Sequence, residues 1–258
     1  MQRRWIVAIG AIALLVAACG EKNVKRAGNT EAISTHKSAK GDSTVYGLAC
    51  DGCTDSILVF LPYSGGDPDT FDIIYAHQHQ RVFGRPHIGD ELAVIVNPED
   101  KDEALTVINL ETLKGEWCYR VMPTMRNIES MPKRMQRRML EQMPDSIKQQ
   151  FFVPREFGFK LKRDYTASPI GLMRSGNTSD DQSPVEYPKL KWYNEWRIYN
   201  GRIILTQNME TYAFTSEDRK TESDTADIVL LRSDTLVLQF RDHTQGYYLR
   251  VDTTRTTR

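Results

Sequence analysis

Short apolar runs, separated by residues that favour turns, recur along the chain from residue 44 to residue 251. The runs are rich in Val, Ile, Leu, Phe and Tyr, which suit the pleated, half-buried surface of a strand. Between them stand turn residues such as Gly65-Gly66-Asp67-Pro68 and Asn200-Gly201, the second of which is a strong hairpin signal. The pattern predicts a mostly β chain and excludes collagen-like and coiled-coil folds.

The first group of runs predicts a small barrel over residues 44–111. The runs cover residues 44–48, 56–61, 71–76, 91–96 and 105–110. Five short strands in so compact a stretch are typical of an OB-like barrel.

The second group predicts an antiparallel barrel or sandwich over residues 112–251. At its start Trp117, Tyr119 and Val121 alternate onto one face of a strand. Residues 130–152 break the β pattern as a helical insertion, whereas 174–188 and 216–224 are polar and predict loops. Further runs cover residues 157–163, 192–199, 202–207, 210–214, 228–231, 235–240 and 246–251. Residues 252–258 predict a disordered tail.

The helical insertion has one apolar and one basic side. Ser130 is a candidate N-cap for a helix that ends near Met143. The apolar stripe consists of Met131, Met135, Met139, Leu140 and Met143, and the basic side consists of Lys133, Arg134, Arg137 and Arg138. We expect the stripe to pack as a lid over the barrel, because flexible methionine fills gaps well. Two alternatives stay open, which are Cu(I) binding by thioethers and contact of the basic side with anionic lipid or a partner.

Residues 1–18 have the pattern of an export signal. Arg3 and Arg4 precede an apolar run over residues 6–18 that is too short to span a bilayer. The run ends in Val16-Ala17-Ala18-Cys19-Gly20, which resembles the lipobox of bacterial lipoproteins. The resemblance implies cleavage before Cys19, a diacylglyceryl thioether on its sulfur, acylation of the new amino terminus with a fatty acid such as palmitate, and firm membrane anchoring. An aspartate directly after the cysteine would resemble an inner-membrane retention signal, but this chain has Gly20 there. The outer membrane is therefore the expected destination.

Residues 19–43 predict a flexible tether between the anchor and the folded part. They contain almost no large apolar residue and cannot bury enough surface to offset the entropy of ordering. A flexible coil of this length spans on the order of 27 Å.

Residues 113–251 resemble the lipocalin-like domains of many bacterial lipoproteins. The resemblance rests on Gly115-Glu116-Trp117 at the first strand, a hairpin over residues 196–205, the paired runs 227–231 and 234–238, and the closing Tyr247-Tyr248-Leu249-Arg250. It implies a barrel that binds a small apolar ligand or an envelope partner. Separately, residues 46–57 are similar to the Cys-x-x-Cys segment of NlpE-type copper-homeostasis lipoproteins.

Cys50 and Cys53 are the most conspicuous pair of reactive side chains. In an exported protein a local disulfide across a tight turn is the default. Thiol-redox chemistry and metal binding stay open as alternatives, because thiolates suit copper and zinc. On a strand, His77 and His79 would share a face and could join such a metal site. Cys118 is expected to be a buried, reduced side chain.

Charge and missing motifs narrow the function. The chain carries 34 basic and 34 acidic residues with no long basic run, so nucleic acid is an unsuitable partner. It has no GxSxG elbow, P-loop or dinucleotide fingerprint, and it nominates no catalytic residue and no cofactor. We predict a non-enzymatic, lipid-anchored envelope protein that binds a small apolar ligand or a partner. The alternatives are a metal or thiol-redox sensor and a structural protein with a filled barrel.

Overall fold

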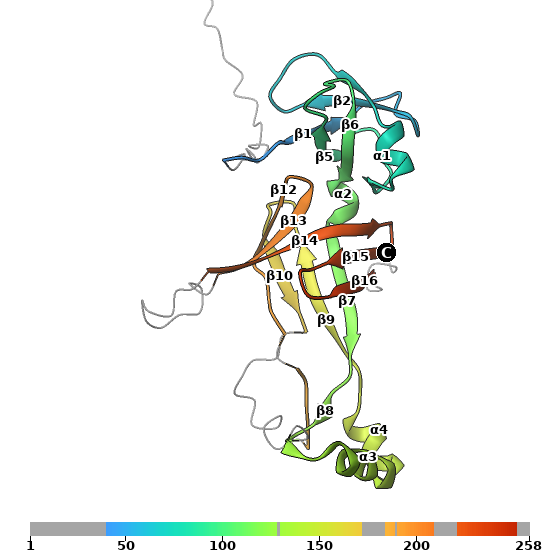
Figure 1. Ribbon diagram of the computed structural model, residues 1–258, viewed down its shortest axis with the longest axis vertical. Coiled ribbons are helices and arrows are strands. Elements are labelled where there is room, and N and C mark those ends of the chain that lie inside the picture. Colours follow the sequence, from blue (N-terminus) through green and yellow to red (C-terminus); the bar gives the residue numbers. More distant parts are fainter. Residues whose placement is uncertain (1–39, 128–129, 172–183, 189, 209–220, 252–258) are drawn as a thin grey trace, which may run out of the picture. The chain divides into compact units, whose positions relative to one another are not determined.

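The computed structural model describes residues 40–127, 130–171, 184–188, 190–208 and 221–251. These residues form two main sheets, of which the first is mostly and the second wholly antiparallel, and four helices (Figure 1). The predicted signal peptide, most of the predicted tether, the run at 210–214 and the tail at 252–258 lie outside the described residues. The mostly β prediction is confirmed.

The first sheet contains six strands in the order β3-β2-β1-β5-β6-β4. They are β1 (Thr44–Ala49), β2 (Ile57–Pro62), β3 (Asp69–Asp72), β4 (Val82–Phe83), β5 (Glu91–Val96) and β6 (Ala104–Asn109). A parallel bridge joins Asp72 to Glu103, so the sheet curls back towards β6. Strand β1 pairs with both β2 and β5, and helix α1 (Ile74–Gln78) follows the third strand, which is an OB-like arrangement.

The predicted strand at 71–76 is wrong in its second half. Strand β3 ends at Asp72, whose carboxylate accepts a hydrogen bond from the backbone N of Ile74 at 2.7 Å. His77 N then donates to Ile73 O at 2.8 Å, so a helical turn begins here. An aspartate that binds the backbone two residues ahead favours a turn over a continued strand.

Helix α2 (Leu110–Leu113) leads from the first sheet into the barrel. Asn109 caps it, since its side-chain oxygen accepts from Thr112 N at 3.1 Å. The Asn109 amide nitrogen donates to Arg85 O at 2.8 Å and to an Asp90 carboxylate oxygen at 2.7 Å. This fully buried side chain therefore fixes the start of α2 against two turns of the first sheet.

The second sheet is a nearly closed, eight-stranded, up-and-down barrel with the order β10-β9-β7-β16-β15-β14-β13-β12. Its strands are β7 (Gly115–Val121), β9 (Arg155–Leu161), β10 (Ala167–Ile170), β12 (Glu195–Tyr199), β13 (Arg202–Asn208), β14 (Thr221–Leu231), β15 (Thr235–Gln239) and β16 (Thr244–Leu249). A bridge between Thr166 and Glu195 closes the ring beside β10 and β12. The barrel expected from the lipocalin-like resemblance is confirmed as a fold.

One turn, one glycine within a strand and the start of another strand show how particular residues shape the barrel. Asn200 and Gly201 both have positive φ, of 49° and 74°, which is the type I′ turn expected for this dipeptide. Gly158 lies so close to β7 that a Cβ at this position would come within 1.9 Å of Trp117 O. The position therefore requires glycine. The loop prediction over 216–224 is wrong at its end, since β14 begins at Thr221 and pairs its polar residues with β13.

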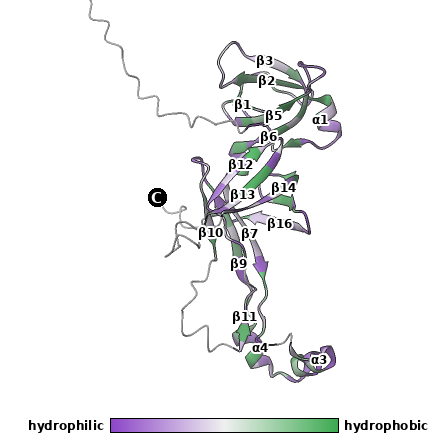
Figure 2. Ribbon diagram, turned by 60° about the vertical axis from the view of Figure 1, so that its left-hand side comes forward, coloured by the Kyte–Doolittle hydropathy of each residue, from purple (hydrophilic) through white to green (hydrophobic). Residues whose placement is uncertain are grey.

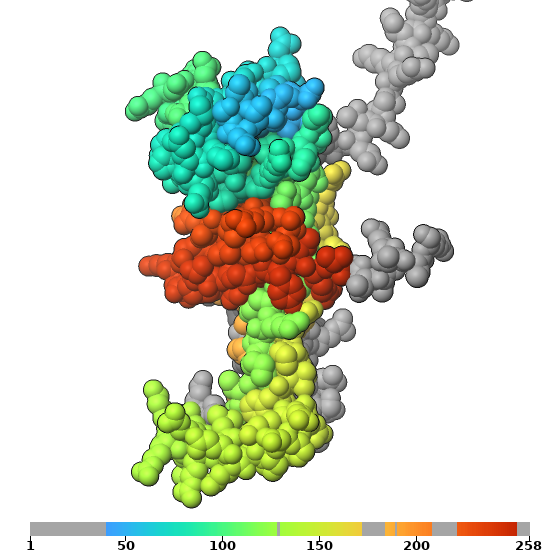
Figure 3. Space-filling view, turned by 90° about the vertical axis from the view of Figure 1, so that its right-hand side faces the viewer, coloured from blue at the N-terminus to red at the C-terminus, as the bar shows by residue number. Residues whose placement is uncertain are grey.

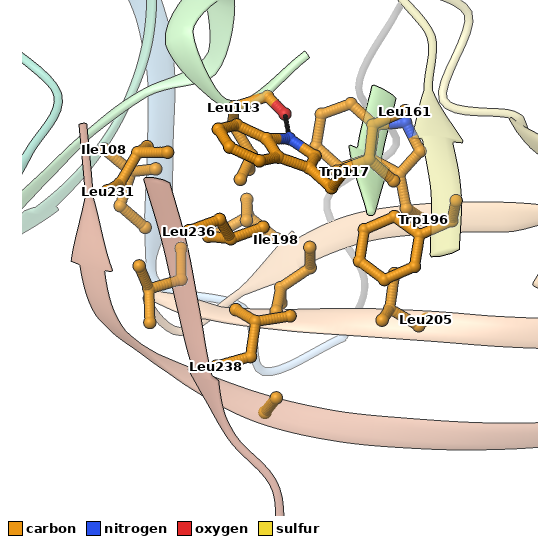
Figure 4. Close-up of a cluster of buried hydrophobic side chains, with 14 of the residues drawn as sticks. Ile108, Leu113, Trp117, Leu161, Trp196, Ile198, Leu205, Leu231, Leu236 and Leu238 are labelled. Carbon is orange, nitrogen blue, oxygen red and sulfur yellow. Dashed lines mark hydrogen bonds between the residues drawn. The ribbon is translucent and has the colours of Figure 1, made fainter. Parts of the chain in front are cut away.

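The barrel interior is filled by side chains from alternate strand positions (Figure 4). Trp117 is fully buried and its indole nitrogen donates to Leu113 O at 2.7 Å. Trp196 is also buried and donates to Lys162 O at 3.0 Å. The same hydrophobic cluster takes in Phe83, Ala93, Ile108, Leu110 and Leu113 from the first sheet and α2. Residues on both sides of the predicted boundary at 111 thus share one core.

The predicted tether ends within the fold. Ser43 N donates to the side-chain oxygen of Asn200 at 2.8 Å, and Asn200 N donates to an Asp42 carboxylate oxygen at 3.0 Å. The Asn200 side chain also donates to Gly41 O at 3.2 Å. The residues just before β1 are therefore held on the hairpin turn of the barrel.

The helical insertion forms, but Pro132 and not Ser130 is the N-cap residue of its first helix, and the lid expectation is wrong. It consists of α3 (Lys133–Gln142) and α4 (Asp145–Phe151), flanked by the short pair β8 (Thr124–Met125) and β11 (Val185–Glu186). Neither helix contains a buried residue. Figure 2 shows hydrophobic and hydrophilic residues interleaved along α3. A four-residue methionine spacing identifies one helical face, but it does not specify what covers that face.

Candidate functional site

Cys50 and Cys53 lie in the turn between β1 and β2. Gly52, with φ of 95°, allows the tight turn. Both cysteines are free and partly exposed in the structure, and Cys53 Sγ lies 3.2 Å from Cys50 O and 3.5 Å from Val59 O. The turn brings the two residues together as their spacing requires, and a disulfide between them stays a prediction.

The histidines of the metal hypothesis lie on α1 and not on a strand. His77 belongs to the helix and His79 is its C-cap residue, and both are exposed. Residues two apart on a helix point to different sides, so the two rings diverge. His79 instead stacks on Tyr75, with ring centroids 4.0 Å apart, and its Nδ1 lies 2.9 Å from Tyr75 O.

Within the described ranges, no three or more His, Cys, Asp or Glu side chains are grouped so that they could hold a metal ion. The structure therefore does not assemble Cys50, Cys53, His77 and His79 into one site. The metal hypothesis gains no geometric support.

Cys118 is fully buried, as predicted, on the face of β7 opposite to Trp117. Burial raises the pKa of its thiol to about 11. The thiol is therefore protonated at neutral pH, and a protonated thiol is a poor nucleophile and a poor metal ligand.

The barrel end farther from α2 gathers aromatic side chains from strands that are distant in the sequence. Strand β7 leaves α2 at Gly115, so Tyr119 lies farther along the barrel than Trp117. The Tyr119 ring meets Tyr247 of β16 edge-on, with centroids 5.4 Å apart. Phe159 of β9 lies 5.0 Å from Tyr247 and 6.1 Å from Tyr193. We call Tyr119, Phe159, Tyr193 and Tyr247 the aromatic end.

A carboxylate with two donors lies beside the aromatic end. Tyr193 OH donates to an Asp224 carboxylate oxygen at 2.7 Å, and Lys191 Nζ lies 2.7 Å from the other oxygen. Burial, together with the bond to Asp224, raises the pKa of Tyr193, and the same carboxylate raises the pKa of Lys191. Tyr193 is thus a neutral phenol whose hydroxyl already donates its hydrogen bond to Asp224.

The other two tyrosines of the aromatic end, Tyr119 and Tyr247, have hydroxyl groups that are not hydrogen-bonded to any described residue. Burial raises the pKa of Tyr119 and of Tyr247, so both phenols are neutral and able to donate at physiological pH. Neither hydroxyl makes a hydrogen bond with another residue in the part of the chain that the structure describes. Among the described residues no buried side-chain oxygen or nitrogen lacks a hydrogen-bond partner, so these two hydroxyl oxygens are at least partly open to solvent. These two donors stand in an aromatic, largely apolar setting that suits a small ligand carrying an acceptor.

The α2 end of the barrel is closed by an ionic cluster. Lys114 Nζ lies 2.7 Å from one Glu91 carboxylate oxygen and 2.9 Å from a Glu111 oxygen, and Tyr165 OH donates to the second Glu91 oxygen at 2.8 Å. Burial and the Glu91 carboxylate also raise the pKa of the nearby Tyr63 to about 12. Glu91 belongs to the first sheet, Glu111 and Lys114 to α2 and its end, and Tyr165 to the turn before β10, so the four residues join the two sheets. We call Glu91, Glu111, Lys114 and Tyr165 the ionic cluster.

Sequence reasoning missed most of the aromatic end. The alternation of Trp117 and Tyr119 indicated a shared face, and Tyr247 belonged to the lipocalin-like resemblance. Tyr193 and Asp224 carried no local signal, because they meet only when β12, β13 and β14 pair in register. The cysteines and histidines that the sequence favoured are not at this site.

Comparisons with known proteins find no matching protein-family model and no matching curated protein. One similar solved structure is a lipocalin-like protein from Bacteroides thetaiotaomicron, with 16% identity over 53% of this chain and 95% of that chain, and a TM-score of 0.28.

Among the helices of the described segments, none combines the length and apolar character needed to cross a bilayer.

Proposed function

We propose that the chain is a lipid-anchored, non-enzymatic protein of the bacterial cell envelope that binds a small, largely apolar ligand at the aromatic end. The observation that carries the ligand proposal is the pair of uncommitted hydroxyl groups on Tyr119 and Tyr247 among aromatic rings. A nearly closed barrel with one end occupied by α2 and the ionic cluster leaves the other end for a ligand. The expected ligand is apolar, with at least one hydrogen-bond acceptor.

Native mass spectrometry of tagless full-length protein, extracted from its own envelope, tests this proposal. We expect the wild type to retain a small-molecule mass. Replacing Tyr119 and Tyr247 with Phe keeps both rings and removes two donors, which should weaken retention by about tenfold or more, since each bond contributes about 1 kcal/mol. Tyr75→Phe, on exposed α1, is the matched control and should retain the mass. No retained mass in the wild type, or equal retention by the double variant, contradicts the proposal.

A structural role with a filled barrel is the second candidate function. It is favoured by the burial of Trp117 and Trp196, whose indole nitrogens are both satisfied by backbone carbonyls. Such a barrel needs no ligand to complete its core. The same measurement separates the two functions, because a filled structural barrel leaves the envelope without a retained small molecule.

The anchoring part of the proposal rests on the lipobox-like residues 16–20. The expected location is the outer membrane. Cells grown with labelled palmitate should label the wild-type chain, and Cys19→Ser should abolish the label, because the thioether and the following amino-terminal acylation both depend on that sulfur. Cys118→Ser is the control and should keep the full label. Labelled protein in the Cys19→Ser variant would show that the anchor assignment is wrong.

A further inference from the structure

Helix α3 exposes an apolar face that no described element covers. The exposed fractions of Met135, Met139 and Leu140 are 58%, 41% and 37%, and no residue of α3 is buried. Met122 and Val153, in the chain on either side of the insertion, are exposed by 54% and 47%. In Figure 3 no other part of the chain lies in front of the side chains of the helical insertion, which are coloured yellow-green. Exposed apolar groups concentrated on one short segment indicate a contact surface.

The same helix carries a concentrated positive charge. Lys133, Arg134, Arg137 and Arg138 are all exposed, and the one acidic residue within α3, Glu141, lies 3.7 Å from Arg137 as an exposed pair. Residues 126–155 contain seven basic and three acidic residues, whereas the rest of the chain contains 27 basic and 31 acidic. The insertion is therefore a cationic segment on an otherwise slightly acidic protein.

The arrangement of these residues around α3 is amphipathic. At 3.6 residues per turn, Met135 and Met139 lie on one side and Arg137 lies opposite to them. Arg134 and Arg138 lie on one flank of the methionines, and Leu140 and Lys133 lie next to each other on the other flank. A short helix with an apolar stripe and a cationic face is the arrangement that lies in the plane of an anionic membrane surface.

We infer that α3 docks on the surface of a bilayer that contains anionic lipids. Met135, Met139 and Leu140 enter the boundary between headgroups and acyl chains, and the cations contact lipid phosphates. Charge complementarity selects this occupant. A second copy of the chain would bring two cationic helices together, whereas an anionic surface attracts every charge on the basic side. This inference does not depend on the ligand proposed for the barrel.

Vesicle flotation tests the inference with protein that cannot be held by a lipid anchor. The chain is produced without residues 1–19, so that every described residue is retained. It is mixed with vesicles of phosphatidylcholine alone, or with about one third phosphatidylglycerol. We expect flotation only with the anionic vesicles, and its loss at about 0.5 M salt, where surface charges are screened.

Charge variants identify the part of the protein responsible. Replacing Arg134, Arg137 and Arg138 with Gln should lower the partition coefficient by roughly fivefold for each charge, or about 100-fold for three. Replacing the same residues with Lys should preserve binding. The matched control replaces three exposed cations elsewhere, Lys101, Arg232 and Arg241, with Gln, and should bind within about threefold of the wild type because these side chains lie outside the helix.

A third variant separates a surface helix from a packed one. Met135→Asp with Met139→Asp should abolish flotation while the melting temperature stays within about 2 °C, because substitutions at exposed sites have small effects on stability. A large fall in melting temperature would show that these methionines pack in the fold, and would overturn the inference. Equal binding to neutral vesicles, absence of binding to either kind, or wild-type binding by the Gln variant would also overturn it.

Discussion

Trp117→Ala should destabilise the protein by about 3–5 kcal/mol, which is the usual effect of removing a buried tryptophan. The side chain is fully buried, and its loss leaves both a cavity in the barrel core and a Leu113 carbonyl without its donor. The free energy of unfolding, measured by urea denaturation with circular dichroism, reports the effect.

The control for this prediction is Val229→Ala. Val229 lies on β14 with half of its side chain exposed, so its truncation should cost less than about 1 kcal/mol. A loss below about 1 kcal/mol for Trp117→Ala would show that the tryptophan is not part of a packed core.

Lys114→Met should also destabilise the protein by about 3–5 kcal/mol, because it leaves the buried Glu91 carboxylate without its cation. The Lys114 and Glu91 side chains are each only 10% exposed. Changing both residues at once, to Met and Gln, should restore most of the lost stability, since no unpaired charge then remains buried. The two variants and Glu91→Gln form a double-mutant cycle that can be measured by urea denaturation.

Lys160→Met provides the matched control for the ionic cluster. Lys160 also pairs with a carboxylate, Glu116, at 2.9 Å, but its side chain is 46% exposed. Exposed ion pairs contribute little, so this variant should lose less than about 1 kcal/mol. If Lys114→Met costs no more than Lys160→Met, the ionic cluster is not a buried junction between the sheets.

The strands of the fold were largely predictable, because alternation and turn chemistry act locally. Residues 91–96 were predicted as a strand and form β5, and the Asn200-Gly201 turn joins β12 and β13. The start of β14 was missed since Thr221 and Glu222 are polar, and only their pairing with β13 makes them a strand. Tertiary pairing decided this boundary against the local preference.

The surroundings of each element were much harder to predict. The methionine spacing located α3 and its two faces, but the expectation that the apolar face packs on the barrel was wrong, since burial depends on which elements meet in three dimensions. The candidate site shows the same limit. Tyr119 and Tyr247 are 128 positions apart in the sequence, and they meet because β7 and β16 are neighbours.

The pairing of β7 with β16 has a consequence for the order in which the chain can fold. Strands β1 to β6 end at Asn109, so the first sheet contains all of its strands before any barrel strand is needed. The barrel, in contrast, joins Trp117 to Leu249, and β7 and β15 each keep an unpaired edge until β16 lies between them. Exposed strand edges promote association between chains. The last strand therefore ends the period in which the newly made protein is most prone to aggregate.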